Sequence, residues 1–372
     1  MTKKLIIASV TLIGTIIGAG ILGIPFVIMK SGFGLGLINM IFIALIMVIT
    51  ILYLGEISQR TKKNHHLTGY AEKYLGKKGK MLMFIAFSIG IYSALLAYII
   101  GVGQSLSQLF FNIPDFTIQF GILFWLVLSA MTYSGLKTLK DGELFGIALI
   151  FILLVTIIFT SFGDINFSNL AYNNLNHLFT PFGVILFAFL GFASVPEVKR
   201  ILGKDQKLMK KTIIYSYLTA FIIYALFAAI VLGLKGTQTP QIATLALGIP
   251  FILLGILTMF TSYLAISNAL VDTLKFDFKK SKNKAWLITI SLPLILFLIL
   301  EFTGTAIFTK VLGIGGVISG GLTAIIILHM VKKSKENGDQ KPAYSIPYHP
   351  LLIKIMVLVF ITGAVIEVMN IL

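Results

Sequence analysis

The stretch GTIIGAGILGIP, residues 14–25, lies in the first long apolar run of the chain. A helix of roughly 20 apolar residues spans a bilayer, and this run is long enough to do so. Glycine lowers helix propensity and proline removes a backbone hydrogen bond, so the stretch predicts a helix interrupted inside the membrane. Unwound backbone at that depth is costly unless it lines a polar cavity or faces a ligand. The stretch therefore predicts a binding site.

A second interruption is predicted in FAFLGFASVPE, residues 187–197, where a glycine again precedes a proline by five positions. The two runs lie five predicted spans apart, so they cross the membrane in opposite directions. Interrupted spans at matching positions of two inverted halves are typical of secondary transporters. Gly14 and Gly18 also have the spacing of a small-residue packing motif. The clustered glycines and the matching proline favour a break over packing alone.

Two such breaks offer the chemistry to bind an amino acid. Freed backbone N–H groups and the positive end of a half-helix attract a carboxylate. Freed carbonyl oxygens accept hydrogen bonds from an ammonium group or coordinate a cation. An α-amino acid zwitterion presents both groups, so the breaks predict a transporter of amino acids.

Composition excludes a soluble globular protein. Of 372 residues, 57% are hydrophobic and 12% charged, more apolar surface than a soluble domain of this size buries. The net charge of +16 does not indicate nucleic-acid binding, because the Lys and Arg residues lie in loops between apolar segments and form no known nucleic-acid module. The chain has no cysteine, so neither disulfides nor thiolate chemistry is expected.

Eleven apolar segments are predicted to span the membrane. They are 5–29, 33–57, 81–111, 116–134, 143–162, 178–201, 211–233, 243–272, 285–301, 304–330 and 352–371. With the N-terminus inside, every Lys and Arg except Lys30, Lys235 and Lys310 lies on the inner side. The positive-inside rule therefore predicts an N-terminus inside and a C-terminus outside. The first segment is interpreted as a retained span, since no clear signal-peptide cleavage site follows it.

Two inner loops carry further patterns. In LTGYAEKYLG, residues 67–76, the apolar positions Leu67, Tyr70, Ala71 and Tyr74 follow helical spacing. This pattern predicts a short interfacial helix lying on anionic headgroups. The run KPAYSIPYHP, residues 341–350, is interpreted as a proline-punctuated connector before the last span.

Three motifs resemble the amino acid/auxin permease family, in particular the tyrosine/tryptophan permeases, within the amino acid–polyamine–organocation superfamily. They are GTIIGAGILGIPF (14–26), FAFLGFASVPEVKR (187–200) and GGVISGGLTAIIILHM (315–330). The resemblance implies a single all-α integral membrane domain of the LeuT-type fold, with discontinuous first and sixth helices. Two inverted repeats of five helices would cover about 5–162 and 178–330, and an eleventh helix, 352–371, would follow.

The resemblance also implies substrate contacts. Backbone amides of Gly18, Ala19 and Gly20 would bind the carboxylate, and carbonyls around Phe187, Ala188 and Leu190 would bind the ammonium group. The full set of candidate substrate residues is Thr15, Gly18, Ala19, Gly20, Tyr92, Tyr98, Phe187, Ala188, Phe189, Leu190 and Phe192. For each aromatic residue, ordinary helix or lipid packing remains the alternative.

For the coupling ion, the resemblance implies a Na⁺ site between the first break and the eighth span. The implied ligands are carbonyls of Gly14, Ile17 and Thr258 and hydroxyls of Thr261 and Ser262. The hydroxyls could instead bond only to carbonyls of their own helix. Proton coupling is the rival. The lysine that some proton-driven relatives place in the fifth span is absent from 143–162.

Carboxylates near the inner ends of spans bear on the same question. Glu56 and Glu197 are candidates for a proton relay. Each has a base within four residues, so pairing or a cytoplasmic gate is the favoured interpretation. Glu301 and Lys310 are interpreted as interfacial.

The predicted function is a multi-pass plasma-membrane secondary transporter of neutral, apolar amino acids that works by alternating access. A channel is the second class considered, but no charged pore ring or filter loop is visible. An enzyme is not expected, because the histidines lie at loops or span ends and no catalytic motif occurs. The expected partners are a small amino acid and the lipid bilayer. Neither a cofactor beyond Na⁺, nor nucleic acid, nor an obligatory protein partner is expected.

Overall fold

The computed structural model describes residues 3–135, 152, 156 and 162–369, and within them it is built from helices. The longer helices are α1 (Lys3–Ile16), α2 (Gly20–Ser31), α3 (Phe33–Arg60), α4 (Leu67–Phe111), α5 (Thr117–Ser134), α8 (Phe182–Ala188), α9 (Val195–Leu202), α10 (Met209–Lys235), α11 (Ile249–Phe276), α12 (Lys282–Phe302), α13 (Phe308–Gly315), α14 (Gly321–Asn337) and α15 (Pro350–Met369). A short helix, α7 (Ser168–Ala171), lies in the loop before α8, and a π-helical segment, η7 (Gly316–Gly320), joins α13 to α14. Apart from one isolated bridge between Gly32 and Asn173, the described part has no β-pairing.

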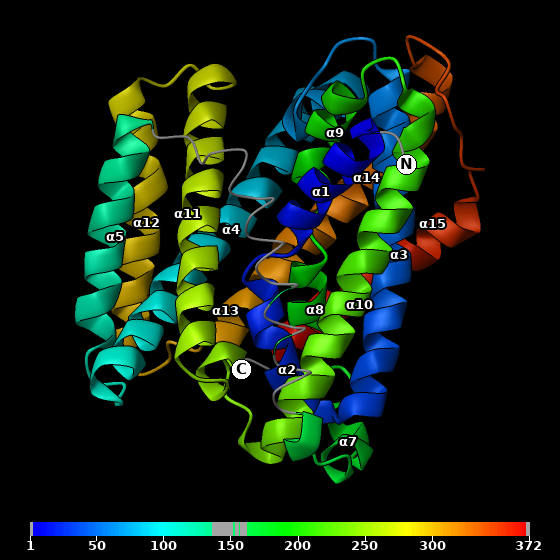
Figure 1. Cartoon of the computed structure of the whole chain (residues 1–372). Helices are drawn as coiled ribbons and strands as arrows, with labels where there is room; N and C mark the ends of the chain where they lie inside the picture. The colour runs from blue at the N-terminus through cyan, green and yellow to red at the C-terminus, as the bar shows by residue number, and fades with distance from the viewer. Residues whose placement is uncertain (1–2, 136–151, 153–155, 157–161, 370–372) are drawn as a thin grey trace.

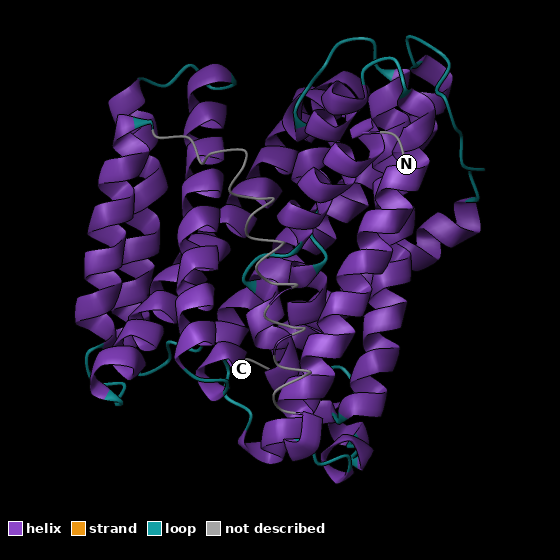
Figure 2. Ribbon diagram, in the orientation of Figure 1, coloured by secondary structure: helices purple, strands orange, loops and turns teal. Residues whose placement is uncertain are grey.

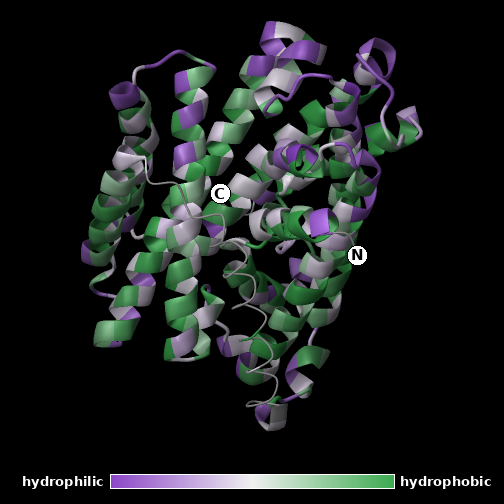
Figure 3. Cartoon of the chain, turned by 45° about the horizontal axis from the view of Figure 1, so that its top comes forward, coloured by the Kyte–Doolittle hydropathy of each residue, from purple (hydrophilic) through white to green (hydrophobic). Residues whose placement is uncertain are grey.

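The predicted spans correspond to these helices. Among the described residues, nine helices or joined helices are long and apolar enough to cross a membrane, and α1 with α2 forms a tenth, bent span. The predicted segment 143–162 falls almost wholly outside the described residues. In Figure 3 the helices are coloured hydrophobic over much of their length, and hydrophilic colour is frequent at helix ends and in loops. The chain is a multi-pass membrane protein.

Lipid-facing surfaces explain why so many apolar side chains lie outside the core. Large exposed hydrophobic residues occur on α3, α5, α12 and α15, for example Leu45, Leu126, Ile295 and Leu358. A contiguous apolar surface of this kind is unfavourable in water and favourable in hydrocarbon. Because these helices form the outside of the bundle, their outer faces are the ones that lipid covers.

The helices form two groups (Figures 1 and 2). Helices α5, α11 and α12 lie together at one side, α4 runs obliquely through the middle, and the broken spans pack with α3, α10, α13 and α14 at the other side. The loop after α3, the loop between α11 and α12 and the connector after α14 lie at the same end of the molecule as the N-terminus. These loops carry much of the positive charge, as the predicted topology requires.

The predicted interfacial helix forms, but its apolar face is buried in the protein rather than laid on headgroups. It makes up the first two turns of α4, which bends at Gly76 with φ 74°. Tyr70 is fully buried. The Tyr74 hydroxyl lies 2.7 Å from the Thr61 hydroxyl at the end of α3, and Thr68 donates to Asp277 at the end of α11 (2.8 Å). The segment therefore fastens α3 to α11.

The connector between α14 and α15 is bound along the end of α3. The Glu56 carboxylate, 1% exposed, accepts hydrogen bonds from Arg60 (2.8 Å), Lys335 (2.6 Å) and the Ser345 hydroxyl (2.8 Å). Its second oxygen accepts the Ile346 N–H (2.8 Å). The predicted pairing of Glu56 with Arg60 is thus confirmed, and the same carboxylate also holds α14 and the connector.

Other charged residues near this end of the molecule form hydrogen bonds or ion pairs. Glu197 forms the expected local pair with Arg200 (2.7 Å) on the surface. Lys199 instead turns inward and donates to the Thr61 carbonyl (2.7 Å), which links α9 to α3. Outside the spans, the hydrogen bond from Lys73 lowers the pKa of Asp339 in the connector below its usual value.

Candidate functional site

The two interrupted spans cross each other at their breaks. A Cβ added to Gly20 would lie 2.6 Å from the Ala188 Cα. One added to Gly191 would lie 3.0 Å from Ile16, and one added to Gly23 would lie 3.2 Å from Val184. Residues with higher numbers in the first span contact residues with lower numbers in the second. The two spans therefore run in opposite directions where they meet. That prediction is confirmed, and glycine at 20 is what permits the close approach.

The first break lies between α1 and α2, whose axes differ by 56°. The helical pattern ends as the Ile17 N–H bonds to Ile13 (2.7 Å) and the Gly18 N–H turns to the Ile16 carbonyl (3.0 Å). Among the described residues, a Cβ added at Gly18 would meet one atom within 4 Å, the Tyr98 hydroxyl at 3.7 Å. The described part of the chain therefore leaves the backbone at Gly18 uncrowded on the side where a side chain would project.

The second break separates α8 from α9. The Leu190 N–H bonds to the Phe187 carbonyl (3.1 Å), and residues 190–191 have no regular structure before a 3₁₀ turn, Phe192–Ser194, leads into α9. Figure 2 shows irregular segments at mid-height between helical halves. Both predicted discontinuities are therefore present.

Two tyrosines of α10, which sequence reasoning missed, satisfy the carbonyls at both breaks. The Tyr224 hydroxyl lies 2.8 Å from the Ile16 carbonyl and 2.9 Å from the Ala188 carbonyl, the last residues of α1 and α8. The Tyr217 hydroxyl donates to the Phe189 carbonyl (2.9 Å). Carbonyls at helix ends lack intrahelical partners, so these hydroxyls replace the bonds that the breaks remove.

Of the two candidate tyrosines on α4, the structure brings only Tyr98 to the breaks. Its hydroxyl lies near the Ala19 backbone and the Ser262 side chain, and 3.7 Å from the position that a Cβ on Gly18 would take. The Tyr92 hydroxyl points to another helix and donates to the Ile288 carbonyl in α12 (3.0 Å). The six-residue spacing puts the two tyrosines on different faces of α4.

The candidate residues of the second break pack against different parts of the protein. Phe187 is half-buried and lies against Gly315, where Ser93 of α4 also makes contact. Leu190 packs on Gly320 of the π-helical segment. Phe189 is fully buried, with its ring 5.3 Å from that of Tyr224, so its side chain packs toward α10.

Phe192 is buried at the start of the 3₁₀ turn, and Ala188 meets Gly20 as described above. The remaining candidate, Thr15, donates to the Thr11 carbonyl of its own helix (3.0 Å). Of the candidate residues of this break, Phe187 and Leu190 are half-buried, so their side chains have surface left to border a ligand.

The predicted sodium ligands on α11 are half-buried. Thr258 bonds to the Leu254 carbonyl (2.8 Å), and Thr261 to those of Leu257 and Thr258 (3.1 Å each). These hydroxyls thus bond to carbonyls of their own helix, the alternative to sodium binding given in the sequence analysis. A hydroxyl that donates in this way keeps its lone pairs and can still coordinate a cation.

Ser262 lies beside Tyr98, which is at the first break. Gly14 and Ile17 lie on either side of the end of α1. Of the candidate ligands on α11, the structure thus places Ser262 beside Tyr98, near the first break. It gives no direct contact between the α11 hydroxyls and the carbonyls of α1 among the described residues.

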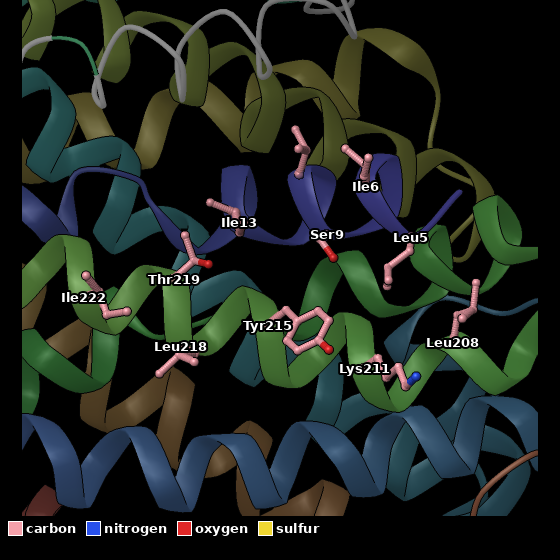
Figure 4. A pocket seen from close by; sticks show the side chains of 11 residues that line it. Leu5, Ile6, Ser9, Ile13, Leu208, Lys211, Tyr215, Leu218, Thr219 and Ile222 are labelled. Atoms are coloured by element: carbon pink, nitrogen blue, oxygen red, sulfur yellow. The ribbon is translucent and has the colours of Figure 1, made fainter. Parts of the chain in front are cut away.

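A groove of about 690 Å³ lies apart from the breaks, between α1 and the first half of α10 (Figure 4). Leu5, Ile6, Ser9 and Ile13 of α1 line one side, and Lys211, Tyr215, Leu218 and Thr219 are among the residues of α10 on the other. No candidate substrate residue lines it. The groove therefore shares no lining residue with the candidate site at the breaks.

Fold and site together define a multi-pass helical membrane protein in which two opposed, interrupted spans cross. The chain belongs to the tryptophan/tyrosine permease family, which matches residues 1–249. This is a family of permeases and not of enzymes.

Three curated relatives are similar to the chain. Glutamine transporter 2 of Aliivibrio fischeri is 26% identical over 369 residues, which cover 91% of this chain and 92% of the relative. Tyrosine-specific transport system 1 of Haemophilus influenzae is 24% identical over 60% of this chain and 56% of its own length. The tryptophan-specific transport protein of Shigella flexneri is 24% identical over 62% and 58%.

Proposed function

We propose that the protein is a secondary active amino acid permease whose substrate binds where the two interrupted spans cross. The observation that carries the proposal is the meeting there of backbone groups that the breaks free from helical hydrogen bonding. The Ala19 amide, next to the Tyr98 hydroxyl, is the proposed partner of the substrate carboxylate. The Ala188 carbonyl, next to the Tyr224 hydroxyl, is the proposed partner of the ammonium group.

The proposed architecture is the LeuT-type fold, with the N-terminus inside. The opposed crossing of α1–α2 with α8–α9 supports inverted repeats covering about 5–162 and 178–330, with α15 as the additional helix. Placement in the wider amino acid–polyamine–organocation superfamily belongs to the same proposal. Alternating access then moves spans one, two, six and seven against spans three, four, eight and nine around the crossing.

The proposed substrates are neutral amino acids. Phe187, Leu190 and Ser93, which line the approach to η7, are apolar or uncharged. None of them could neutralise a charged substrate side chain. The names of the three relatives, which refer to glutamine, tyrosine and tryptophan, point in the same direction.

Uptake into proteoliposomes tests the proposal. Counterflow of labelled L-tryptophan, L-tyrosine and L-glutamine is expected to show saturable accumulation of at least one of them. The same amino acid should raise the melting temperature of the purified protein, because a ligand that binds the native state stabilises it by mass action. Unsaturable downhill flux without counterflow would instead indicate a channel.

For coupling, we propose Na⁺ held by the carbonyls of Gly14, Ile17 and Thr258 and the hydroxyls of Thr261 and Ser262. The contact of Ser262 with Tyr98 supports this assignment, because it brings α11 to the first break. A cation there would join the same unwound backbone that holds the substrate carboxylate. That shared backbone would couple the two ligands.

Proton coupling is a second candidate, and one observation favours it. Glu367 of α15, which the sequence analysis did not single out, is 8% exposed in a membrane-spanning helix, and its carboxylate lies against Gly183 of α8, where an added Cβ would be 2.7 Å from it. A Cβ at Gly313 would overlap its carboxylate. None of the described Lys, Arg or His residues forms an ion pair with it. A buried ionisable group without an ion-pair partner is costly inside the membrane, so Glu367 is a candidate for a functional role.

Imposed gradients separate the two ions. Uptake is expected to rise with an inward Na⁺ gradient at constant pH, and Thr261→Ala with Ser262→Ala should remove that stimulation. Glu367→Gln should keep it. Uptake that ignores Na⁺, follows a pH gradient and is lost in Glu367→Gln would show that the sodium site is wrong and that Glu367 carries the proton.

A further inference from the structure

The Tyr224 hydroxyl connects the two broken spans through a single proton. It is fully buried, and the Ile16 and Ala188 carbonyls lie 2.8 Å and 2.9 Å from it. A phenol donates one hydrogen and has no second to offer. The two carbonyls therefore share one donor, and neither bond is a full two-centre hydrogen bond.

The position of the Tyr224 hydroxyl between the ends of α1 and α8 explains why a hydrogen-bond donor is needed at this point. Ile16 ends α1 and Ala188 ends α8, so both carbonyls lack the intrahelical partner that an unbroken span would supply. Inside a membrane such groups must be satisfied by the protein or by a ligand. Tyr217 lies seven residues earlier on the same face of α10. Its hydroxyl donates to the Phe189 carbonyl, which belongs to the second break alone.

We propose that the Tyr224 hydroxyl competes with the substrate ammonium group for the Ala188 carbonyl. The proposal rests on the proposed function and specifies how the site recognises an α-amino group. A hydrogen bond from a charged N–H donor is about twice as strong as one from a neutral donor such as a phenol. An ammonium group can therefore replace the hydroxyl at Ala188, whereas a ligand without one cannot.

Displacement has a consequence for the first span. Once an ammonium group occupies the Ala188 carbonyl, the hydroxyl proton of Tyr224 is left to the Ile16 carbonyl alone. The bond between α10 and the end of α1 then strengthens. Ser216 already fastens the same pair of helices by donating to the Ser9 carbonyl (3.1 Å). Binding at the second break thereby tightens the first break through one side chain.

Tyr224→Phe tests this competition, with Tyr217→Phe as the matched control. Each change removes one hydroxyl from the same face of α10. The probes are three pairs: L-tryptophan with indole-3-propionate, L-tyrosine with 3-(4-hydroxyphenyl)propionate, and L-glutamine with 4-carbamoylbutanoate. The second member of each pair lacks the amino group. Dissociation constants are measured on the purified protein with the pair whose amino acid the wild type binds.

Removing the competitor should tighten binding of the amino acid by about five-fold, the factor that one ordinary hydrogen bond contributes. Binding of the analogue without an amino group should stay unchanged, so the ratio of the two constants shifts in Tyr224→Phe and not in Tyr217→Phe. An unchanged ratio, or weaker amino acid binding in Tyr224→Phe, overturns the proposal. If the wild type binds none of the three amino acids, the proposed function itself fails.

A second measurement leaves the hydroxyl in place. With 3-fluorotyrosine incorporated at position 224, the ¹⁹F resonance reports the hydrogen bonding of the adjacent hydroxyl. The amino acid should shift this resonance, and the analogue without an amino group should not. Equal shifts with both probes would contradict displacement by ammonium, even if Tyr224→Phe proved too unstable to assay.

Discussion

Replacing Gly18 by leucine is expected to abolish amino acid uptake while the protein still folds and inserts. Gly18 does not have a positive φ, so leucine can adopt its backbone conformation. In the part of the chain that the structure describes, the first atom of the new side chain meets nothing closer than the Tyr98 hydroxyl at 3.7 Å. The rest of the side chain then fills the space beside the Ala19 amide, where the substrate carboxylate is proposed to bind.

Two further glycine variants serve as controls for Gly18→Leu. Gly18→Ala adds one ordinary contact and should retain most of the stability. Gly20→Ala places a methyl group 2.6 Å from the Ala188 Cα, so it should destabilise the crossing itself, by about 1–3 kcal/mol as overpacked cores do.

Uptake and thermal unfolding are measured together for all three variants. Loss of uptake at nearly unchanged melting temperature is the expected result for Gly18→Leu. Wild-type uptake in Gly18→Leu would move the substrate away from the first break.

Replacing Glu56 by alanine is expected to cause the largest loss of stability. The carboxylate is buried and gathers Arg60, Lys335, Ser345 and the Ile346 N–H from α3, α14 and the connector. Removing one member of a buried charge network leaves the others uncompensated, which costs about 3–5 kcal/mol. Two neighbouring cations would then remain, with no carboxylate between them.

Glu197→Ala is the matched control for Glu56→Ala. It also removes a glutamate that pairs with an arginine on its own helix, but this pair is at the surface. Such pairs contribute about 0–1 kcal/mol. Thermal unfolding in detergent should separate the two variants widely, and limited proteolysis should cut 338–349 faster in Glu56→Ala. Similar melting temperatures for both variants would contradict the role given to Glu56.

The breaks were predictable because their cause is local. Glycine and proline act on the backbone of their own residues, so residues 14–25 and 187–197 indicated interruption without knowledge of the neighbouring helices. The opposite directions of the two spans followed from counting apolar segments. Ten of the eleven predicted spans match described helices or helix pairs for the same reason, since the length and polarity of a span are properties of one segment.

The partners of the breaks were not predictable, because they depend on how distant segments pack. Tyr217 and Tyr224 lie seven residues apart and so share a face of α10, but nothing in that spacing says that the face meets the ends of α1 and α8. Tyr92 and Tyr98 were equivalent candidates until the rotation of α4 was known. Glu367 could have been noticed as a carboxylate in the last apolar segment, although its contacts with α8 and α13 could not.

A structure with the transported amino acid bound would show directly whether the substrate binds at the crossing. We expect the substrate carboxylate within hydrogen-bond distance of the Ala19 amide and the ammonium group on the Ala188 carbonyl, with Tyr224 bonded to Ile16. An amino acid found instead in the groove between α1 and α10, with the crossing unchanged, would contradict this expectation.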